Sequence, residues 1–231
     1  MPTSTAAIPW RELLGFALAI GFSPLHIGML LLLLLGQAPL RRGGWFVAGW
    51  LVTSALMVVL LLVLGHGLLL SMTLGSSHRT GLDLLGAGAL LALGIREIMQ
   101  REGEGEPPAW TRRLNDFTAS PLPLLLGLSA LLQVVSPDDF FLYAKTAAGL
   151  LAAGLAPSQE AVATFGFAVI SGLLLLLPLL AVVLVGQERL QPRLESARSW
   201  LFGNGDLLVG GISLLLAAYL GWQGIEGLRP V

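Results

Sequence analysis

Two Ser-Pro pairs, each followed by ionisable side chains, are the features of this sequence best suited to chemistry. Ser23-Pro24 precedes His26 in one apolar run, and Ser136-Pro137 precedes two aspartates and a lysine in another. Ionisable groups inside an apolar run are costly and usually face a cavity or a partner, and a histidine can carry a proton near neutral pH. We therefore expect a site that binds a substrate or a proton and consists of Ser23, Pro24, His26, Ser136, Pro137, Asp138, Asp139 and Lys145.

Each ionisable residue also has a structural interpretation. Lys145 lies about two helical turns beyond Asp138, so the two are expected to form an ion pair, although Lys145 can also snorkel toward the membrane surface. Ser136 and Asp139 have the spacing of a capping box, in which Asp139 would only satisfy the start of its helix. His26 can donate a hydrogen bond to a neighbouring carbonyl group.

The Ser-Pro pairs are expected to break two helices. Proline lacks a backbone donor and disfavours helix at the residue before it. It suits the first position of a new helix, where the preceding serine can act as a cap. Each second helical segment would then point free backbone amides into the membrane, where they can bind an anionic or polar group.

The elements that must position these residues are long apolar runs. The chain has 231 residues, of which 12% are charged and 55% hydrophobic, whereas soluble domains carry about 25% charged residues. Spans of about 20 apolar residues cross a membrane as helices, because barrels need alternating patterns. We expect an all-α polytopic membrane protein whose six transmembrane helices cover Leu13–Leu35, Trp45–Leu70, Leu82–Met99, Leu122–Leu155, Val162–Val185 and Leu207–Ile225.

Smaller features refine this picture. Pro178 is expected to kink the fifth helix. Two polar connections contain apolar residues at helical spacing, which is typical of segments that lie in the membrane interface. These residues are Trp110, Leu114 and Phe117 in one connection and Leu190, Leu194, Ala197 and Leu201 in the other. Both stretches are also compatible with ordinary connectors.

Composition also argues against several functions. The net charge of −1 gives no reason to expect binding to nucleic acid, and the absence of cysteine excludes disulfides and thiolate chemistry. The sequence has no phosphate-binding loop, nucleophile–base pair or haem signature, and no complete set of metal ligands. We expect no enzyme, no cofactor and no metal site.

An internal repeat relates the two halves of the chain. Gly15–His26 aligns with Leu128–Asp139, so that the Ser-Pro pairs coincide and the final histidine lies opposite the final aspartate. Farther along, Asp83–Leu85 matches Asp206–Leu208 in the same order. Internal repeats of this kind are common in transporters.

Three helices per half is an odd number, so the second half must enter the membrane from the opposite side. We expect two inverted three-helix repeats, with helices one and four broken at the Ser-Pro pairs. Residues 1–99 would form the first repeat, 100–121 a cytoplasmic linker and 122–231 the second repeat.

The distribution of arginine predicts the orientation. By the positive-inside rule, the arginine-rich first, third and fifth loops lie in the cytoplasm and both termini lie outside. We expect a multi-pass protein of the cytoplasmic (inner) membrane that contacts membrane lipids. Abundant small residues on helix faces are compatible with a homodimer. The arginines of these loops are Arg41, Arg42, Arg96, Arg101, Arg112, Arg113, Arg189, Arg193 and Arg198, against Arg11, Arg79 and Arg229 on the other side.

Four segments give the chain a family resemblance. Gly21–Ile27, Trp110–Thr118, Val135–Leu142 and Trp200–Asn204 resemble the GAP family, also called Sap or peptidoglycolipid-addressing proteins, of the lysine exporter (LysE) superfamily. The resemblance implies six helices in inverted halves and a role in export across the cytoplasmic membrane. Mycobacterial relatives are associated with delivery of envelope glycolipids, and other branches export amino acids or metal ions.

One segment departs from the family pattern. Members typically carry Asn-Pro-Lys at the break in helix four, where this chain has Ser136-Pro137-Asp138. An acidic side chain thus replaces a basic one, and a relative's substrate cannot be transferred directly.

Three functions are compatible with these features. The first is a secondary exporter of a small solute or envelope lipid, which binds between broken helices one and four. The second is a non-transporting accessory protein for lipid export, and the third is a cation or metal exporter that uses the acidic pair. A polar cavity that joins His26 to Asp138 would favour transport, whereas a dry centre with Asp139 bonded only to its helix start would favour the accessory protein.

Overall fold

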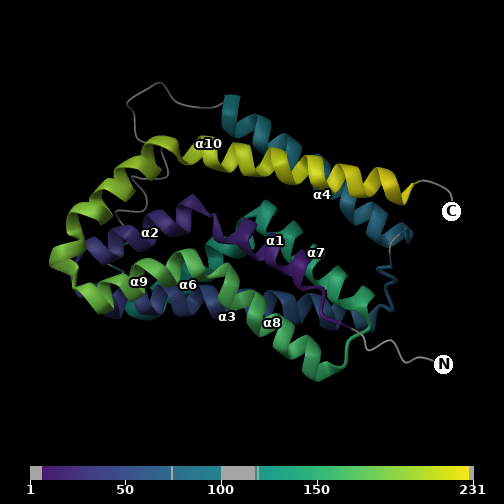
Figure 1. The fold of residues 1–231 in the computed structure, drawn as a ribbon, viewed down its shortest axis with the longest axis horizontal. Coiled ribbons are helices and arrows are strands. Elements are labelled where there is room, and N and C mark those ends of the chain that lie inside the picture. Colours follow the sequence, from purple (N-terminus) through teal and green to yellow (C-terminus); the bar gives the residue numbers. More distant parts are fainter. Residues whose placement is uncertain (1–6, 74, 100–117, 119, 229–231) are drawn as a thin grey trace.

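The computed structural model describes residues 7–73, 75–99, 118 and 120–228, and its regular structure in these residues is entirely helical (Figure 1). The predicted all-α class is therefore confirmed. The described helices are α1 (Trp10–Gly21), α2 (Pro24–Leu35), α3 (Pro39–Gly67), α4 (Ser77–Met99), α6 (Leu122–Val135), α7 (Pro137–Ala153), α8 (Pro157–Ser171), α9 (Leu173–Val185) and α10 (Gln187–Gly227).

Length and composition identify two to five membrane spans among the described helices. The single helices α3 and α10 are long and apolar enough to cross a membrane, and three bent pairs qualify if each pair is one span. The expected third span lies in α4, which does not qualify by itself. Charged residues near both ends of α4 shorten its apolar stretch; they are Arg79, Asp83, Arg96 and Glu97.

The first two bent pairs meet at the serines that precede the prolines. Between α1 and α2 the chain turns by 58°, and Ser23 has extended backbone angles. Between α6 and α7 the bend exceeds 40°, and Ser136 is likewise extended. In both pairs proline is the first residue of the second helix, where its missing N–H group costs no helical hydrogen bond.

The third bend lies before Pro178, the residue at which the sequence predicts a kink. This proline lies inside α9, and the 63° bend occurs earlier, between the end of α8 at Ser171 and the start of α9 at Leu173. Gly172 occupies this bend, and a side chain there would meet Leu51 at 2.7 Å. The close approach of α3 thus accompanies the bend, whereas Pro178 is accommodated within the helix.

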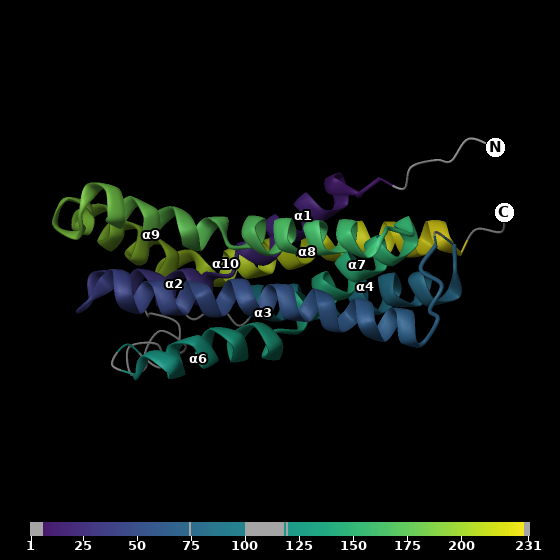
Figure 2. The same ribbon diagram turned by 90° about the horizontal axis from the view of Figure 1, so that it is seen from below.

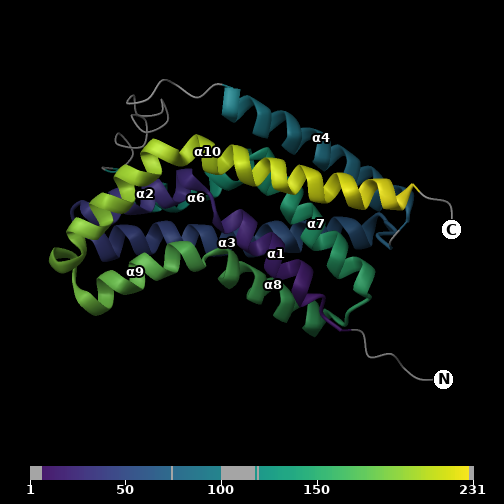
Figure 3. The same ribbon diagram turned by 45° about the horizontal axis from the view of Figure 1, so that its top comes forward.

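The helices form two packed groups around α2. α4 and α10 run side by side (Figures 1 and 3), while α3 packs against α6 on one side and α8 and α9 on the other (Figure 2). α2 contacts both α3 and α10. Its residue His26 and all residues from Gly28 to Leu34 are buried. A helix that is apolar all round belongs in such a position.

The outer surface is apolar. Large hydrophobic side chains on the outward faces of several helices are well exposed, and examples are Leu56, Val63, Leu184, Leu215 and Trp222. A soluble monomer rarely exposes apolar surface on this scale. The exposed faces agree with a multi-pass membrane protein.

The structure describes only one of the two segments that are expected in the membrane interface. Leu190, Leu194 and Leu201 belong to α10, which begins at Gln187, and all three are buried. The segment that contains Trp110, Leu114 and Phe117 lies outside the described residues, as does most of the expected linker. The division of the chain into 1–99, 100–121 and 122–231 stays a prediction.

Candidate functional site

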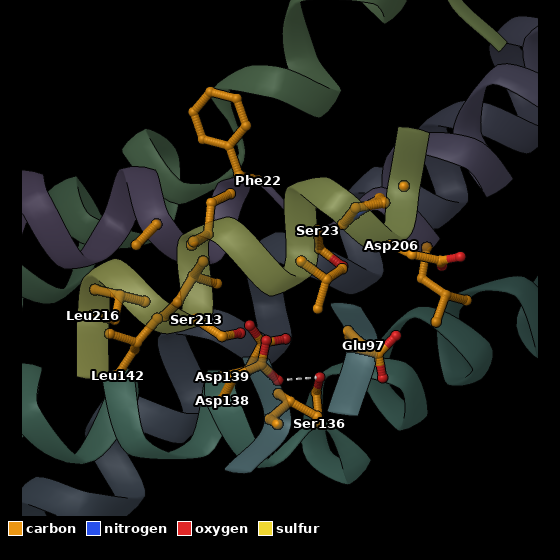
Figure 4. Close-up of a pocket in the computed structure, with 18 residues that line it drawn as sticks. Phe22, Ser23, Glu97, Ser136, Asp138, Asp139, Leu142, Asp206, Ser213 and Leu216 are labelled. Carbon is orange, nitrogen blue, oxygen red and sulfur yellow. Dashed lines mark hydrogen bonds between the residues drawn. The ribbon is translucent and has the colours of Figure 1, made fainter. Parts of the chain in front are cut away.

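A cavity of about 230 Å³ lies between the two Ser-Pro segments and is also lined by residues of α4 and α10 (Figure 4). Most of the residues expected at the site line this cavity. They are Ser23, Pro24, Ser136, Asp138 and Asp139. Pro137 begins α7 beside them, whereas His26 and Lys145 do not line the cavity.

The two adjacent aspartates have different environments. Ser136 Oγ donates a hydrogen bond of 2.6 Å to Asp138 Oδ1. Asp139 is only 3% exposed, and its Oδ2 atom has no hydrogen-bond partner. Ser136 makes no side-chain cap to the backbone of α7. The capping-box interpretation is therefore wrong, and Asp139 is a buried carboxyl group that faces the cavity.

Two further carboxylates reach the same cavity from other helices. Glu97 lies near the end of α4, and Asp206 lies on α10. The charges of Asp206 and Asp138 both repel a charge on Glu97, whereas the neighbouring Arg96 attracts it. None of the described side chains that line the cavity is a lysine, arginine or histidine. The ionisable groups of its wall are therefore all acidic.

Sequence reasoning missed both of these carboxylates as site residues. Asp206 was noted only as the repeat counterpart of Asp83, and Glu97 lies at the edge of an apolar run, where a charge is unremarkable. Their closeness to the first aspartate pair depends on how α4 and α10 pack.

His26 is buried beside the cavity, and both nitrogens of its ring have hydrogen-bond partners. Its Nε2 atom lies 3.2 Å from the carbonyl oxygen of Ser129, and its Nδ1 atom lies 2.8 Å from Ser23 Oγ. The ring meets Trp50 edge-on, with centroids 4.4 Å apart. If Nε2 donates to the carbonyl group, Nδ1 of the neutral ring accepts from Ser23. The expected cavity thus reaches Ser23 but not His26.

Lys145 does not pair with Asp138, and that prediction is wrong. Its Nζ atom forms a buried ion pair with Asp83 of α4 and donates a 2.9 Å hydrogen bond to Gln223 Oε1 of α10. The reason is geometric, because α7 presents Lys145 to α4 and α10 two turns away from Asp138. With 1% of its surface exposed, Lys145 does not snorkel either.

The Lys145 pair belongs to a larger set of polar contacts, here called the terminal network. Gln223 Nε2 donates to the hydroxyl of Tyr219 at 2.7 Å, and Arg79 forms an ion pair with Glu12 at 3.5 Å. Arg79 is only 4% exposed. The network consists of Glu12, Arg79, Asp83, Lys145, Tyr219 and Gln223, and it ties α1, α4, α7 and α10 together where α1 begins and α10 ends.

A third polar group lies in the packed core away from the cavity. Tyr143 donates to Gln133 Oε1 at 3.0 Å, and its hydroxyl lies 2.9 Å from Ser54 Oγ. Gln133 also donates to the carbonyl oxygen of Trp50 at 3.2 Å. These groups satisfy one another, as buried polar groups in a packed core must, so we assign them to structure.

Metal binding has little geometric support. Among the residues that the structure describes, no three histidine, aspartate or glutamate side chains come close enough together to hold a metal ion. The cavity carboxylates are instead spread around its wall.

Comparison with known proteins adds one finding. The family model described as "Sap, sulfolipid-1-addressing protein" matches residues 13–226, which include both Ser-Pro segments and almost all of the described helices. Neither the curated proteins nor the solved structures give a significant match.

Proposed function

Because the chain belongs to the family of Sap, sulfolipid-1-addressing proteins, we propose that it is a secondary transporter that exports an envelope lipid or a small solute across the cytoplasmic membrane. The substrate would bind in the cavity between the two Ser-Pro segments. The family name connects its namesake with a sulfolipid, which makes a lipid the first substrate class to test.

The observation that carries this proposal is a polar cavity inside an otherwise apolar helical protein. Ser23 and Ser136 place extended backbone at its wall, where α2 and α7 begin. Non-helical backbone is tolerated at membrane depth only where it is buried in protein or lines a water-filled cavity. Discontinuous helices around a central site are also a recurring feature of secondary transporters.

The pattern of helix contacts supports an inverted repeat. In this proposal α1 and α2 correspond to α6 and α7, α3 corresponds to α8 and α9, and α4 corresponds to α10. The observed packing of α1 on α8 then corresponds to that of α6 on α3, and the packing of α2 on α10 to that of α7 on α4. Each bent pair would be one span, and α4 would complete a total of six.

Transport would occur as the two halves rock around the cavity. The terminal network, in which Arg79, Asp83 and Lys145 are buried, would close the end where α1 begins. Access would then come from the side of Glu97 and Asp206. By the distribution of arginine, this side would face the cytoplasm and the termini would lie outside.

The small volume of the cavity is also compatible with a second candidate function. A volume of about 230 Å³ is below the roughly 300–1,000 Å³ of typical ligand pockets, so a whole lipid does not fit. A non-transporting accessory protein for envelope lipid export would need no larger cavity. In a transporter, only a headgroup would enter and the acyl chains would remain in the membrane.

Flux in reconstituted vesicles tests the proposal. Proteoliposomes would be assayed for translocation of fluorescent sulfated glycolipid, fluorescent phosphatidylethanolamine and radiolabelled ethanolamine. We expect wild type to move at least one probe and Asp139→Asn to slow it about tenfold, since the lost charged interaction is worth about 1.5–3 kcal/mol. Glu226→Gln, which alters an exposed acid on α10, should match wild type.

Two results would count against transport at this site. If none of the three probes crosses the membrane although the protein is folded, the accessory function is favoured. If Asp138→Asn and Asp139→Asn both leave flux unchanged, the substrate does not use this cavity.

A further inference from the structure

The charge of the central cavity identifies the class of group that it binds. We infer that the cavity recognises a small ammonium group, carried either by a free amine or by the headgroup of an aminolipid. This inference rests on the proposed function for its biological meaning, but it makes a separate claim about equilibrium binding.

The arrangement of the carboxylates favours a cation. Four carboxyl groups from three helices line one small space, and Figure 4 shows them around it together with the Ser213 side chain. Asp138 and Asp139 lie in the first turn of α7, where the helix dipole offsets some of their charge. Glu97 lies near the C-terminal end of α4, where the dipole opposes a negative charge. The helix dipole therefore does not compensate that charge, and on α4 only the adjacent Arg96 attracts it.

Asp139 is the most direct indication of a missing partner. It is 3% exposed, it lines the cavity, and its Oδ2 atom makes no hydrogen bond. A buried polar atom without a partner is rare in folded proteins and costs about 1–3 kcal/mol. A ligand that donates a hydrogen bond to this oxygen would remove that cost.

The geometry favours an ammonium group over a metal ion. No three acidic or histidine side chains in the described parts of the chain converge closely enough to chelate an ion. An ammonium group instead has three N–H donors that can reach separate acceptors. Ser23, Ser136 and Ser213 supply hydroxyl groups in the same wall.

An anionic group fits the cavity poorly. A sulfate or phosphate would meet four carboxyl groups and none of the cationic side chains that usually bind such anions. The volume of about 230 Å³, against roughly 30 Å³ for one water molecule, accommodates a group of several heavy atoms such as ethanolamine.

Calorimetric titration of the full chain in phosphatidylcholine nanodiscs tests this inference. The probes are ethanolamine, its neutral counterpart ethylene glycol, and inorganic sulfate. We expect ethanolamine to bind and the other two probes not to bind. Asp139→Asn and Asp206→Asn should each weaken ethanolamine about tenfold or more, whereas Glu226→Gln should have no effect. Asparagine has nearly the shape of aspartate, so folding should be retained in both site variants, and circular dichroism verifies it.

A second arm distinguishes the two sources of the ammonium group. Nanodiscs with phosphatidylethanolamine in place of phosphatidylcholine should weaken apparent ethanolamine binding if the lipid headgroup occupies the cavity. Unchanged binding in both nanodiscs would assign the cavity to a free amine.

Several results would overturn the inference. These are tighter binding of sulfate than of ethanolamine, equal binding of ethylene glycol, or ethanolamine binding that both site variants leave unchanged. Failure of the proposed function is distinguishable, because ethanolamine binding without flux would retain the site and reject transport. Lipid flux without ethanolamine binding would support transport and reject the ammonium site.

Discussion

Lys145 shows how a single residue in an apolar helix can hold three elements together. Its ammonium group is buried between Asp83 of α4 and Gln223 of α10, and neither partner is near it in sequence. Taking two charges out of water is expensive, and the attraction between them only partly offsets that cost. The pair therefore contributes mainly by specifying how α4, α7 and α10 fit together, and it is vulnerable to loss of one partner.

Removal of the Asp83 charge should destabilise the protein strongly. In Asp83→Asn the Lys145 ammonium group keeps its buried position but loses its counter-ion, which costs about 3–5 kcal/mol for a buried pair. Thermal unfolding of the detergent-solubilised protein, followed by circular dichroism, measures the loss. The double variant Asp83→Leu/Lys145→Met should recover most of it, since apolar pairs of similar volume replace buried ion pairs well. A double variant as unstable as Asp83→Asn would contradict this account.

At the residue scale, sequence reasoning found the cavity aspartates but not their surroundings. Asp138 and Asp139 stand out because acidic residues are rare in apolar runs. The sequence does not identify the partner of Lys145, because that partner depends on which face of α7 meets α4. Glu97 and Asp206 belong to the site only through tertiary packing, and acidic residues at the edges of apolar runs carry no signal in the sequence.

Close contacts between helices depend on glycine at a few positions. A side chain at Gly49 of α3 would lie 2.7 Å from the backbone oxygen of Leu126 in α6. A side chain at Gly21 of α1 would lie 2.7 Å from the backbone oxygen of Ser171 in α8. Backbone atoms cannot move aside as a flexible side chain can, so each helix pair would have to separate. Small residues serve the same purpose in many membrane helices.

Gly49→Ala should therefore weaken the α3–α6 contact. The overpacking is expected to cost about 1–3 kcal/mol, although alanine by itself favours a helix. Gly44→Ala is the matched control on the same helix, because a side chain there has no neighbour within 4 Å. It should be neutral or stabilise by up to about 1 kcal/mol. Thermal unfolding of both variants in the same detergent makes the comparison, and equal midpoints would show that the close contact carries no energy.

At the scale of elements, local chemistry predicted some boundaries and packing set others. α2 and α7 begin at Pro24 and Pro137, where proline is favoured as the first helical residue. The bend at Gly172 had a weaker signal, since only Ser171 and Gly172 interrupt the apolar run there and Pro178 was the more obvious candidate. The bend coincides with close contacts to α3 that sequence alone does not reveal.

For the whole molecule, contacts between distant segments define two ends. At one end Gln187 donates to the backbone oxygen of Gly36, so the connection before α3 lies beside the start of α10. At the other end His66 contacts Glu160 at 3.0 Å, which places the end of α3 beside the start of α8. α3 runs between the two ends and is long enough to cross a membrane. The connections therefore fall into two sets that should face opposite sides of the membrane.

This arrangement gives a topology test for which the chain is well suited. The sequence has no cysteine, so single cysteines can be introduced at exposed positions without background labelling. Gln37→Cys and Glu188→Cys report on one end, and Ser77→Cys and Ser158→Cys report on the other. Under the proposed orientation, a membrane-impermeant maleimide should label the second pair in intact cells and the first pair only after the membrane is opened.

The pattern of labelling separates the inverted repeat from its alternatives. Ser77→Cys lies at the start of α4 and Glu188→Cys at the start of α10, so each half contributes a reporter to each side if the repeats are inverted. If the first pair is labelled in intact cells and the second pair only after the membrane is opened, the inverted repeat is retained and only the orientation is reversed. Labelling of Gln37→Cys and Ser77→Cys from the same side would mean that α3 does not cross the membrane, and the inverted six-span arrangement would then be wrong.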